Sequence, residues 1–427
     1  KQGLDAIERK QLSEQQLWSV SYLQHELQKN AAPAYTYSRS HIGADAPAPL
    51  GFDQMFREDN ALSVGLQLTG EQYAMNINGT FISDASDDKS ARGDESYFAV
   101  LLGNWAVGFG SQSRWWGPGW HNSAILSNAA RPAPSIFIRR NSPTASNLPV
   151  LSALGPWQFE SFASALQQRH PDQDKPILWG TRLTVTPLSS LTFGFANTGI
   201  WAEPHLPSDK SYPPEIDELE DAQAHTSNNE DRSKVMRMHS LDARWGFALG
   251  PVSAAAFAQG AWQRNRGGTD ETLTAVAGLE ASMEILGSHS RIIIEASNAI
   301  ADFESDSIVN RSYNNADYLN GYRHLVSPLA QSFDSDSETY SVSGQHYFAH
   351  GQALKWQLQR VRWKSVNQAA HSFAGSPHNT RIARIQYRFA LSERLMAEIG
   401  ANHFSQPITY KADEIDSGLS LSLFHHW

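Results

Sequence analysis

Hydrophobic and polar residues alternate with a period of two along most of this chain of 427 residues. In residues 62–69, for example, Leu, Val, Leu and Leu alternate with Ser, Gly, Gln and Thr, and residues 384–389 repeat the pattern. Successive side chains of a β-strand point to opposite faces, so each such segment is expected to have one apolar and one polar face. Residues 34–427 are therefore predicted to be all-β.

The alternation predicts eighteen strands, and the lengths of their connections show how they are arranged. The strands are expected at 34–43, 62–70, 72–83, 95–103, 104–114, 135–141, 156–167, 177–187, 191–201, 235–249, 251–263, 271–286, 289–299, 337–348, 353–363, 378–390, 394–405 and 416–427. Short connections such as 103–104 alternate with long ones such as 115–134, 202–234 and 300–336, and only 142–155 departs from this order. One short side and one long side are typical of an outer-membrane barrel.

Soluble architectures fit the strand pattern less well. A propeller or a β-helix would show a repeat of fixed period, and none is present. Side chains can fill only a small barrel, so eighteen strands enclose a polar lumen and direct their apolar faces into lipid. Arg384 and Arg388 are examples of charged residues at inward positions. The predicted fold is a transmembrane antiparallel β-barrel of about eighteen strands.

Residues 1–31 have a different period and are predicted to be helical. Ser13 and Gln16 form a capping-box pattern, after which Leu17, Val20 and Leu23 mark one apolar stripe. The polar face mixes both signs of charge, which favours a packed helix over a membrane-surface helix. No signal peptide is visible in this segment, so an exported form is expected to have lost it.

Composition excludes several classes of function. The net charge is −10 and the pI is near 5.9, which excludes nucleic acid as a partner because such a partner requires a basic face. The chain has no cysteine, which excludes a disulfide framework and a thiolate metal site. The longest apolar run, 97–102, is far shorter than the roughly 20 residues of a spanning helix.

The last strand supports the assignment to the outer membrane. Its outward positions are Leu419, Leu421, Leu423, His425 and Trp427. A final strand that ends in an aromatic residue resembles the signal read by the bacterial barrel-assembly machinery. That machinery, through Trp427, and outer-membrane lipid are therefore expected partners.

A tryptophan-rich turn at 114–120 is the first candidate site. Gly-Pro-Gly interrupts the strand pattern there, and the turn follows the fifth strand, which places it at the outer rim. It is interpreted as a carbohydrate-binding surface or, alternatively, as part of the interfacial aromatic girdle that barrels carry. The candidate contact residues are Arg114, Trp115, Trp116, Trp120, His121 and Asn122.

Two long loops are further candidates. Loop 300–336 contains Tyr318, Tyr322, Arg323, Asp334 and Asp336, which could form a saccharide cleft. Equally, Arg323 could pair with one of the two aspartates and fold the loop over the barrel. Loop 202–234 is rich in acidic residues, which are interpreted as a solvated face or, alternatively, as ligands for a divalent cation that bridges to an anionic glycan.

No catalytic or cofactor site is predicted. His121 and Ser123 are adjacent on one turn, where a base and a nucleophile seldom meet in hydrogen-bond geometry. His425 and His426 point to opposite faces of a strand and cannot chelate a metal together. Phosphate-loop, dinucleotide and metalloprotease motifs are absent from the sequence.

Five short motifs resemble the Wzi-type outer-membrane lectin family of capsule assembly. They are Trp115–Gly119, Arg131–Pro132, Gly155–Trp157, Asn320–Arg323 and the Ser-Phe-Asp-Ser-Asp run at 332–336. The resemblance implies an eighteen-stranded barrel in the bacterial outer membrane. It also implies a helical plug on the periplasmic side, here residues 1–33, and an outer mouth closed by loops.

The function expected from the resemblance is non-catalytic. The barrel, residues 34–427, would bind capsular polysaccharide or exopolysaccharide and attach or organise it at the cell surface. A monomer without metal or cofactor is expected. The alternative is a porin or saccharide-export channel with an open lumen.

Overall fold

The computed structural model of the chain defines a β-barrel. It describes residues 20, 32–44, 51–52, 56–87, 89–148, 152–167, 176–201, 234–264, 271–285, 288–300, 312–315, 318, 320–348, 351–366, 371–411 and 413–426. The predicted helix at 1–31 except Val20, the acidic loop 202–234 except Lys234, and the terminal Trp427 lie outside these residues. No helix within the described residues is long and apolar enough to span a membrane.

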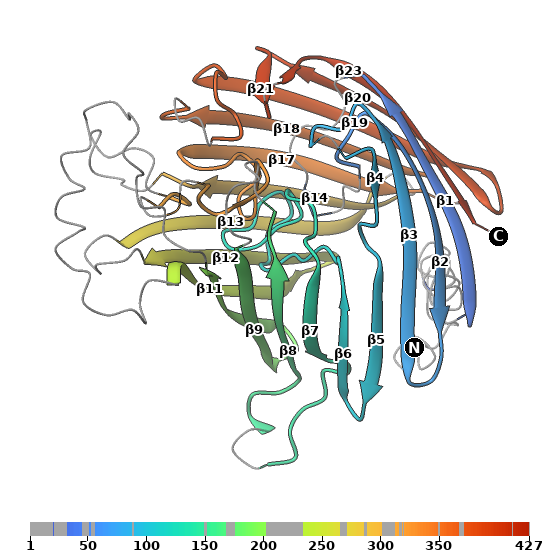
Figure 1. Cartoon of the computed structure of the whole chain (residues 1–427), viewed down its shortest axis with the longest axis vertical. Coiled ribbons are helices and arrows are strands. Elements are labelled where there is room, and N and C mark those ends of the chain that lie inside the picture. Colours follow the sequence, from blue (N-terminus) through green and yellow to red (C-terminus); the bar gives the residue numbers. More distant parts are fainter. Residues whose placement is uncertain are drawn as a thin grey trace.

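Eighteen antiparallel strands of the described residues form the barrel (Figure 1). They are β1 (Ala34–Gly43), β2 (Asn60–Thr69), β3 (Tyr73–Ser83), β5 (Tyr97–Leu102), β6 (Trp105–Gly110), β7 (Ser135–Arg140), β8 (Trp157–Ala165), β9 (Ile177–Leu188), β10 (Leu191–Trp201), β11 (Lys234–Leu249), β12 (Val252–Arg264), β13 (Glu271–Ile285), β14 (Ser288–Asn298), β17 (Ser337–Tyr347), β18 (Ala353–Trp363), β19 (Asn379–Ser392), β20 (Leu395–Phe404) and β23 (Gly418–His426). β23 pairs with β1, with His426 opposite Tyr37, and this pairing closes the barrel. The predicted fold class is confirmed.

Five short strands lie outside this ring. β4 (Ala91–Arg92) extends the sheet beside β3. β15 (Arg323–His324) pairs with β16 (Ser327–Pro328), and β21 (Ile408–Tyr410) pairs with β22 (Asp413–Ile415). These pairs belong to long connections, which therefore have structure of their own.

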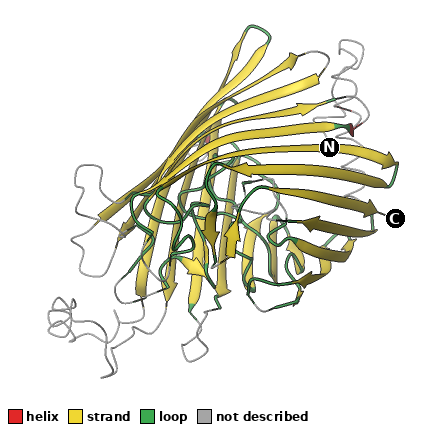
Figure 2. Cartoon of the chain, turned by 90° about the horizontal axis from the view of Figure 1, so that it is seen from above, coloured by secondary structure: helices red, strands yellow, loops and turns green. Residues whose placement is uncertain are grey.

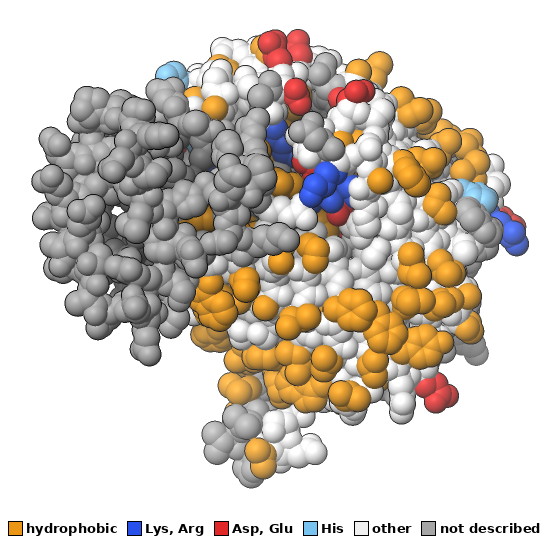
Figure 3. Space-filling view, in the orientation of Figure 1, with side chains coloured by type: hydrophobic (Ala, Val, Ile, Leu, Met, Phe, Trp, Pro, Cys, Tyr) orange, Lys and Arg blue, Asp and Glu red, His pale blue; other side chains and the backbone are white. Residues whose placement is uncertain are grey.

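The two faces of the wall follow the sequence alternation. Apolar side chains such as Phe81 (61% exposed), Leu102 (61%) and Ile136 (67%) point outward, and Figure 3 shows such side chains gathered over the strands. Asn76 and Asn78 of β3 point inward and are buried. An apolar outer face and a polar interior suit a barrel that lies in lipid.

The connections divide the barrel into two ends. At the tight-turn end, strands are joined by short turns such as 103–104 and 189–190, and β1 starts there. At the long-loop end, connections such as 111–134 and 299–336 are much longer. Figure 2 shows loops lying inside the ring of strands. We call residues 111–134 the first inner loop, and the described part of 312–336 the second inner loop.

The inner loops pack against the wall through two apolar clusters. The larger cluster joins Trp116 and Ile125 of the first inner loop to Phe162 of β8 and Tyr322 of the second inner loop. The smaller cluster includes Phe333 and lies against β18, β19 and β20. The core of this protein is thus inside the barrel, where buried apolar area holds the loops in place.

Candidate functional site

The tryptophan-rich turn depends on its two glycines. Gly117 has a φ of 154°, which L side chains rarely adopt, and a Cβ there would lie 2.5 Å from Oε1 of Gln259. A Cβ at Gly119 would lie 2.2 Å from the backbone oxygen of Asn122. Only glycine fits both positions without displacing a neighbour. The Gly-Pro-Gly sequence therefore fixes the path of the turn.

The turn points into the barrel. Trp120 donates its backbone N–H to Glu295 of β14 (2.6 Å) and its indole Nε1–H to Glu280 of β13 (2.6 Å), and Arg291 lies 4.8 Å over its ring. Glu280 and Arg291 lie close to the turn between β13 and β14 at the tight-turn end. The predicted position at the outer rim is therefore wrong, because these contacts hold the turn within the lumen and direct Trp120 toward the tight-turn end.

Arg114 and Trp116 are bound to the wall. Arg114 donates its Nε–H to Glu160 of β8 (2.8 Å) and lies 4.1 Å over the ring of Phe162. The indole of Trp116 donates to the same carboxylate (3.4 Å) and meets Phe162 edge to face. Burial lowers the pKa of Arg114, and the Glu160 charge opposes that shift. Both residues anchor the turn, whereas Trp115 is only partly buried.

The next two residues connect the turn to β17, and the third bonds back to the turn. A hydrogen bond of 2.8 Å joins His121 Nε2 to Ser343 Oγ, and the amide of Asn122, fully buried, donates to Thr339 (3.1 Å). The hydroxyl of Ser123 donates to a backbone oxygen of the turn (2.7 Å). His121 and Ser123 therefore have different hydrogen-bond partners.

A buried ion pair fixes the second inner loop. Arg323 donates its Nε–H and Nη2–H to the two carboxylate oxygens of Asp334, each at 2.7 Å, and both side chains are at most 1% exposed. Asp334 also accepts the N–H and the hydroxyl of Ser372 at 2.9 and 2.8 Å. Burial alone would raise the pKa of Asp334, but the Arg323 charge and these hydrogen bonds hold it well below its usual range. The loop-folding alternative for Arg323 is the one that the structure shows.

The remaining predicted residues of this loop are buried as well. Tyr322 donates its hydroxyl to Thr198 of β10 (2.8 Å), and burial raises its pKa above the usual range. Tyr318 is 2% exposed. Asp336 has a φ of 52° and its backbone N–H donates to Ala299. Their buried positions suit a scaffold for the loop.

A histidine joins the two inner loops at the long-loop end. Its Nδ1 lies 2.9 Å from the backbone oxygen of Arg131, and burial lowers the pKa of this residue, His324, to about 4. The neutral imidazole is therefore the stable form in the folded loop at neutral pH.

Charged side chains form a network beside this contact. Arg131 pairs with Asp87 and Asp94, and Arg92 pairs with Asp87 and Glu58. Burial raises the pKa of Asp87, but the charges of Arg92 and Arg131 outweigh it and lower the pKa. Such a network fixes the loop positions at the long-loop end of the lumen.

Among the described residues, two sizeable cavities lie beside the packed loops. One of about 640 Å³ runs along the β1–β5 wall, from Glu58 and Arg92 at the long-loop end to Tyr35 and Gln67 at the tight-turn end. Another of about 380 Å³ lies beneath Trp115. Both volumes fall in the range of about 300–1,000 Å³ that is typical of small-ligand sites.

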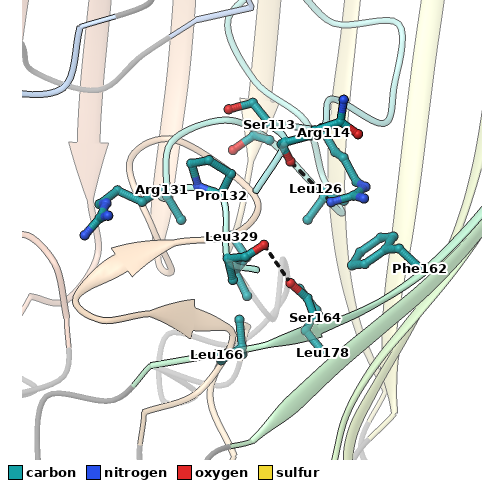
Figure 4. Close-up of a pocket in the computed structure, with 14 residues that line it drawn as sticks. Ser113, Arg114, Leu126, Arg131, Pro132, Phe162, Ser164, Leu166, Leu178 and Leu329 are labelled. Atoms are coloured by element: carbon teal, nitrogen blue, oxygen red, sulfur yellow. Dashed lines mark hydrogen bonds between the residues drawn. The ribbon is translucent and has the colours of Figure 1, made fainter. Parts of the chain in front are cut away.

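The space between the inner loops and the β8–β9 wall is almost filled. Leu126 and Leu329 of the two loops face Phe162, Leu166 and Leu178, and the pocket between them is only about 30 Å³ (Figure 4). This volume has room for about one water molecule.

The structure divides the eleven predicted contact residues into two groups. Seven are buried, namely Trp116, Asn122, Tyr318, Tyr322, Arg323, Asp334 and Asp336, and four are partly exposed, namely Arg114, Trp115, Trp120 and His121. Sequence analysis did not single out the wall residues that hold the turn, Glu160, Glu280, Glu295 and Gln259. Their signal was a carboxylate or amide at an inward position of a strand.

No metal site is visible in the described part of the chain, where no three or more His, Asp or Glu side chains group suitably. The proposed cation-binding loop, 202–234, lies outside that part apart from Lys234.

Comparisons with known proteins agree with this architecture. The family model described as capsule assembly protein Wzi matches residues 38–414. An uncharacterised 55.8 kDa protein in the cps region of Klebsiella pneumoniae is 30% identical over 164 residues, which make up 38% of this chain and 32% of that protein. The match with this curated relative thus spans about a third of its length.

Solved structures show the same fold. Wzi of Escherichia coli, described as an outer membrane protein involved in group 1 capsule assembly and a carbohydrate-binding β-barrel, has a TM-score of 0.80 at 19% identity. The similarity covers 99% of this chain and 90% of that one. OprD of Pseudomonas aeruginosa has a TM-score of 0.51 at 9% identity and covers 92% and 94%. Because the family model spans most of its length, the chain belongs to the capsule assembly protein Wzi family.

Proposed function

We propose that this protein is a non-catalytic outer-membrane barrel that binds exported capsular polysaccharide or exopolysaccharide and keeps it at the cell surface. Membership of the Wzi family and the carbohydrate binding ascribed to the Escherichia coli relative support the proposal. Outer-membrane barrels have short periplasmic turns and long external loops. We therefore propose that the long-loop end faces outward and that the tight-turn end faces the periplasm.

The observation that carries the proposal is that both inner loops are fixed inside the lumen. The first inner loop is bonded to β12, β13 and β14, and the second is held by the buried Arg323–Asp334 pair. Loops fixed in this way suit a binding surface, whereas a porin requires a continuous aqueous path.

The 640 Å³ cavity is our first candidate for glycan contact. It combines the rings of Tyr35, Tyr37 and Tyr97 with amides of Asn76 and Asn78. Aromatic faces pack on sugar rings, and amides and guanidinium groups bond to hydroxyls or acidic substituents. Arg39, which lies 4.5 Å over the ring of Tyr37, supplies a cation in the same cavity.

Four predicted residues of the tryptophan-rich turn are partly exposed and remain proposed glycan contacts, namely Arg114, Trp115, Trp120 and His121. The seven buried ones are proposed to hold the inner loops in place. We further propose that the protein acts as a monomer in outer-membrane lipid and that Trp427 serves the assembly machinery. Residues 1–33 are proposed to close the periplasmic end.

A retention assay tests the proposal. Purified full-length protein in detergent micelles is immobilised and exposed to the capsular polysaccharide of the producing strain. We expect saturable retention that falls in Arg39→Gln and is unchanged in Arg381→Gln, a cation exposed on the wall outside the cavity. Absence of saturable retention by the wild type would refute carbohydrate binding.

The porin alternative is tested by planar-bilayer recording. Steady channels of large conductance from the wild-type protein would favour an open lumen. Because the inner loops are fixed across the lumen, we expect such channels to be absent.

A further inference from the structure

The cavity beside the tryptophan-rich turn lies near the end of the barrel opposite to the one expected from the sequence. Its walls come from Arg139 and Asn141 at the end of β7, Gln158 at the start of β8 and Thr184 near the end of β9. All four lie within a few residues of the tight-turn end. Trp115 of the first inner loop completes the lining. This site of about 380 Å³ therefore belongs to the tight-turn half of the lumen.

The ring of Trp115 is held in place independently of any ligand. Its Nε1–H donates to the backbone oxygen of Gly119 (2.9 Å), and Phe52 meets the ring edge to face at 5.7 Å. An indole fixed in this way offers its surface without a large loss of side-chain entropy on binding. It can therefore pack on the face of a sugar ring.

The polar groups around this ring have hydrogen-bonding capacity to spare. Among the described residues, the side chains of Arg139, Gln158 and Thr184 make no hydrogen bond to another residue. Arg139 and Gln158 are exposed to the lumen. Together they offer a cation, an amide and a hydroxyl on one side of the indole.

The charges of this cavity favour an anion. Glu160 is neutralised by Arg114, and Arg182 by Asp242, at 2.8 and 2.7 Å. Arg139 makes no ion pair with any described residue, and its contact is the ring of Phe137 at 5.6 Å. The other cation that borders the cavity, Arg140, is engaged with Trp157 and with backbone oxygens. The lining therefore carries excess positive charge, and Arg139 is the cation with hydrogen-bonding capacity to spare. A guanidinium suits a carboxylate because it can bind both oxygens.

We propose that this cavity is a second saccharide subsite, on the periplasmic side of the first inner loop, which takes one carboxylated sugar unit. The sugar ring lies against Trp115, its carboxylate pairs with Arg139, and its hydroxyls bond to Gln158 and Thr184. The orientation of the barrel and the carbohydrate nature of the ligand rest on the proposed function. The position of the subsite means that the protein contacts the glycan from the periplasm as well as from outside.

The test is calorimetric titration of the full-length protein in micelles with sodium glucuronate, and with glucose as the uncharged match. We expect glucuronate to bind more tightly than glucose. Arg139→Gln should weaken glucuronate binding about tenfold or more, because a charge-assisted bond is lost, and should leave glucose binding unchanged. Gln158→Ala should weaken both sugars.

Arg140→Gln is the matched control. Arg140 also borders the cavity, but its guanidinium is already engaged: it lies 3.7 Å over the ring of Trp157 and donates to the backbone oxygens of Thr144 and Trp157. We expect glucuronate binding to be unchanged in this variant. Equal losses in Arg139→Gln and Arg140→Gln, or no preference for glucuronate over glucose in the wild type, would overturn the proposal.

Two further measurements separate this subsite from polysaccharide binding at the outer surface and show whether its ligand is the polymer or a free acidic sugar. Binding of the strain's polysaccharide to intact cells reports only the outer surface, and Arg139→Gln should leave it unchanged. Retained polysaccharide binding with no glucuronate binding would refute the subsite alone. An oligosaccharide of the polymer that binds more tightly than free glucuronate would assign the site to the polymer, and equal affinity would assign it to free acidic sugars.

Discussion

The buried Arg323–Asp334 pair should determine whether the second inner loop stays in the lumen. Asp334→Ala removes two bonds of 2.7 Å from Arg323 and two more from Ser372, and leaves a guanidinium that is about 1% exposed without its counter-charge. Breaking a buried pair by removing one partner costs about 3–5 kcal/mol. The free energy that opposes opening of this loop should fall by that amount.

Amide hydrogen exchange followed by mass spectrometry measures this change. A loss of about 3–5 kcal/mol corresponds to exchange that is roughly two to three and a half orders of magnitude faster over residues 320–336. The control is Glu338→Gln, which breaks a pair with Arg362 (3.2 Å) whose cation is 57% exposed, and such pairs contribute less than about 1 kcal/mol. If Asp334→Ala accelerates exchange no more than Glu338→Gln does, the second inner loop is held by other contacts and our reasoning is wrong.

Three further predictions concern the inner loops. The pKa of His324 is lowered to about 4, so its contribution to loop stability is complete above about pH 6.5, where the unfolded state is also neutral, and is lost as the pH falls toward 4. Amide hydrogen exchange of the second inner loop should therefore accelerate in the wild type as the pH falls from 6.5 toward 4. The acceleration should be smaller in His324→Gln. Gly119→Ala should displace the tryptophan-rich turn and speed exchange of residues 114–126, because its Cβ would lie 2.2 Å from a backbone oxygen, whereas Gly79→Ala, with nothing within 4 Å, should not. Trp120→Phe removes the 2.6 Å hydrogen bond to Glu280 and should lower the free energy of unfolding by about 1 kcal/mol. The change is measured as a shift in the urea-unfolding midpoint in micelles. No shift would mean that water replaces the indole as the partner of Glu280.

The barrel could be predicted from the sequence because its cause is local. A period of two assigns each side chain to lipid or lumen, and the lengths of the connections separate the two ends of the barrel. The largest error in a strand boundary was at β6, which ends at Gly110 and not at 114. Residues 111–114 belong to the first inner loop in the structure.

The depth of the tryptophan-rich turn could not be predicted, because it is set by contacts between distant residues. Trp120 meets Glu295, which is 175 positions away. The sequence shows that Glu295 occupies an inward position, but not which loop it binds. The pairing of Arg323 with Asp334 was one of two alternatives, and only the packing of the loop around both residues decides between them.

The accessible groups of the turn were predicted for the wrong side. Trp115 was interpreted as an outer sugar surface because the turn follows a strand that ends at the long-loop side. The fold carries it past the middle of the lumen, where Arg139 of the tight-turn end becomes its neighbour. The strand that precedes the turn therefore does not determine the end of the barrel at which the cavity lies.

The proposed function requires that the protein retains polysaccharide at the cell surface. The direct measurement is the fraction of polysaccharide that stays with washed cells, compared between a strain that lacks this chain and the same strain complemented with it. Our account predicts equal total polysaccharide, with a larger cell-bound fraction in the complemented strain and a larger fraction in the medium without the chain. Equal cell-bound fractions in the two strains would contradict it.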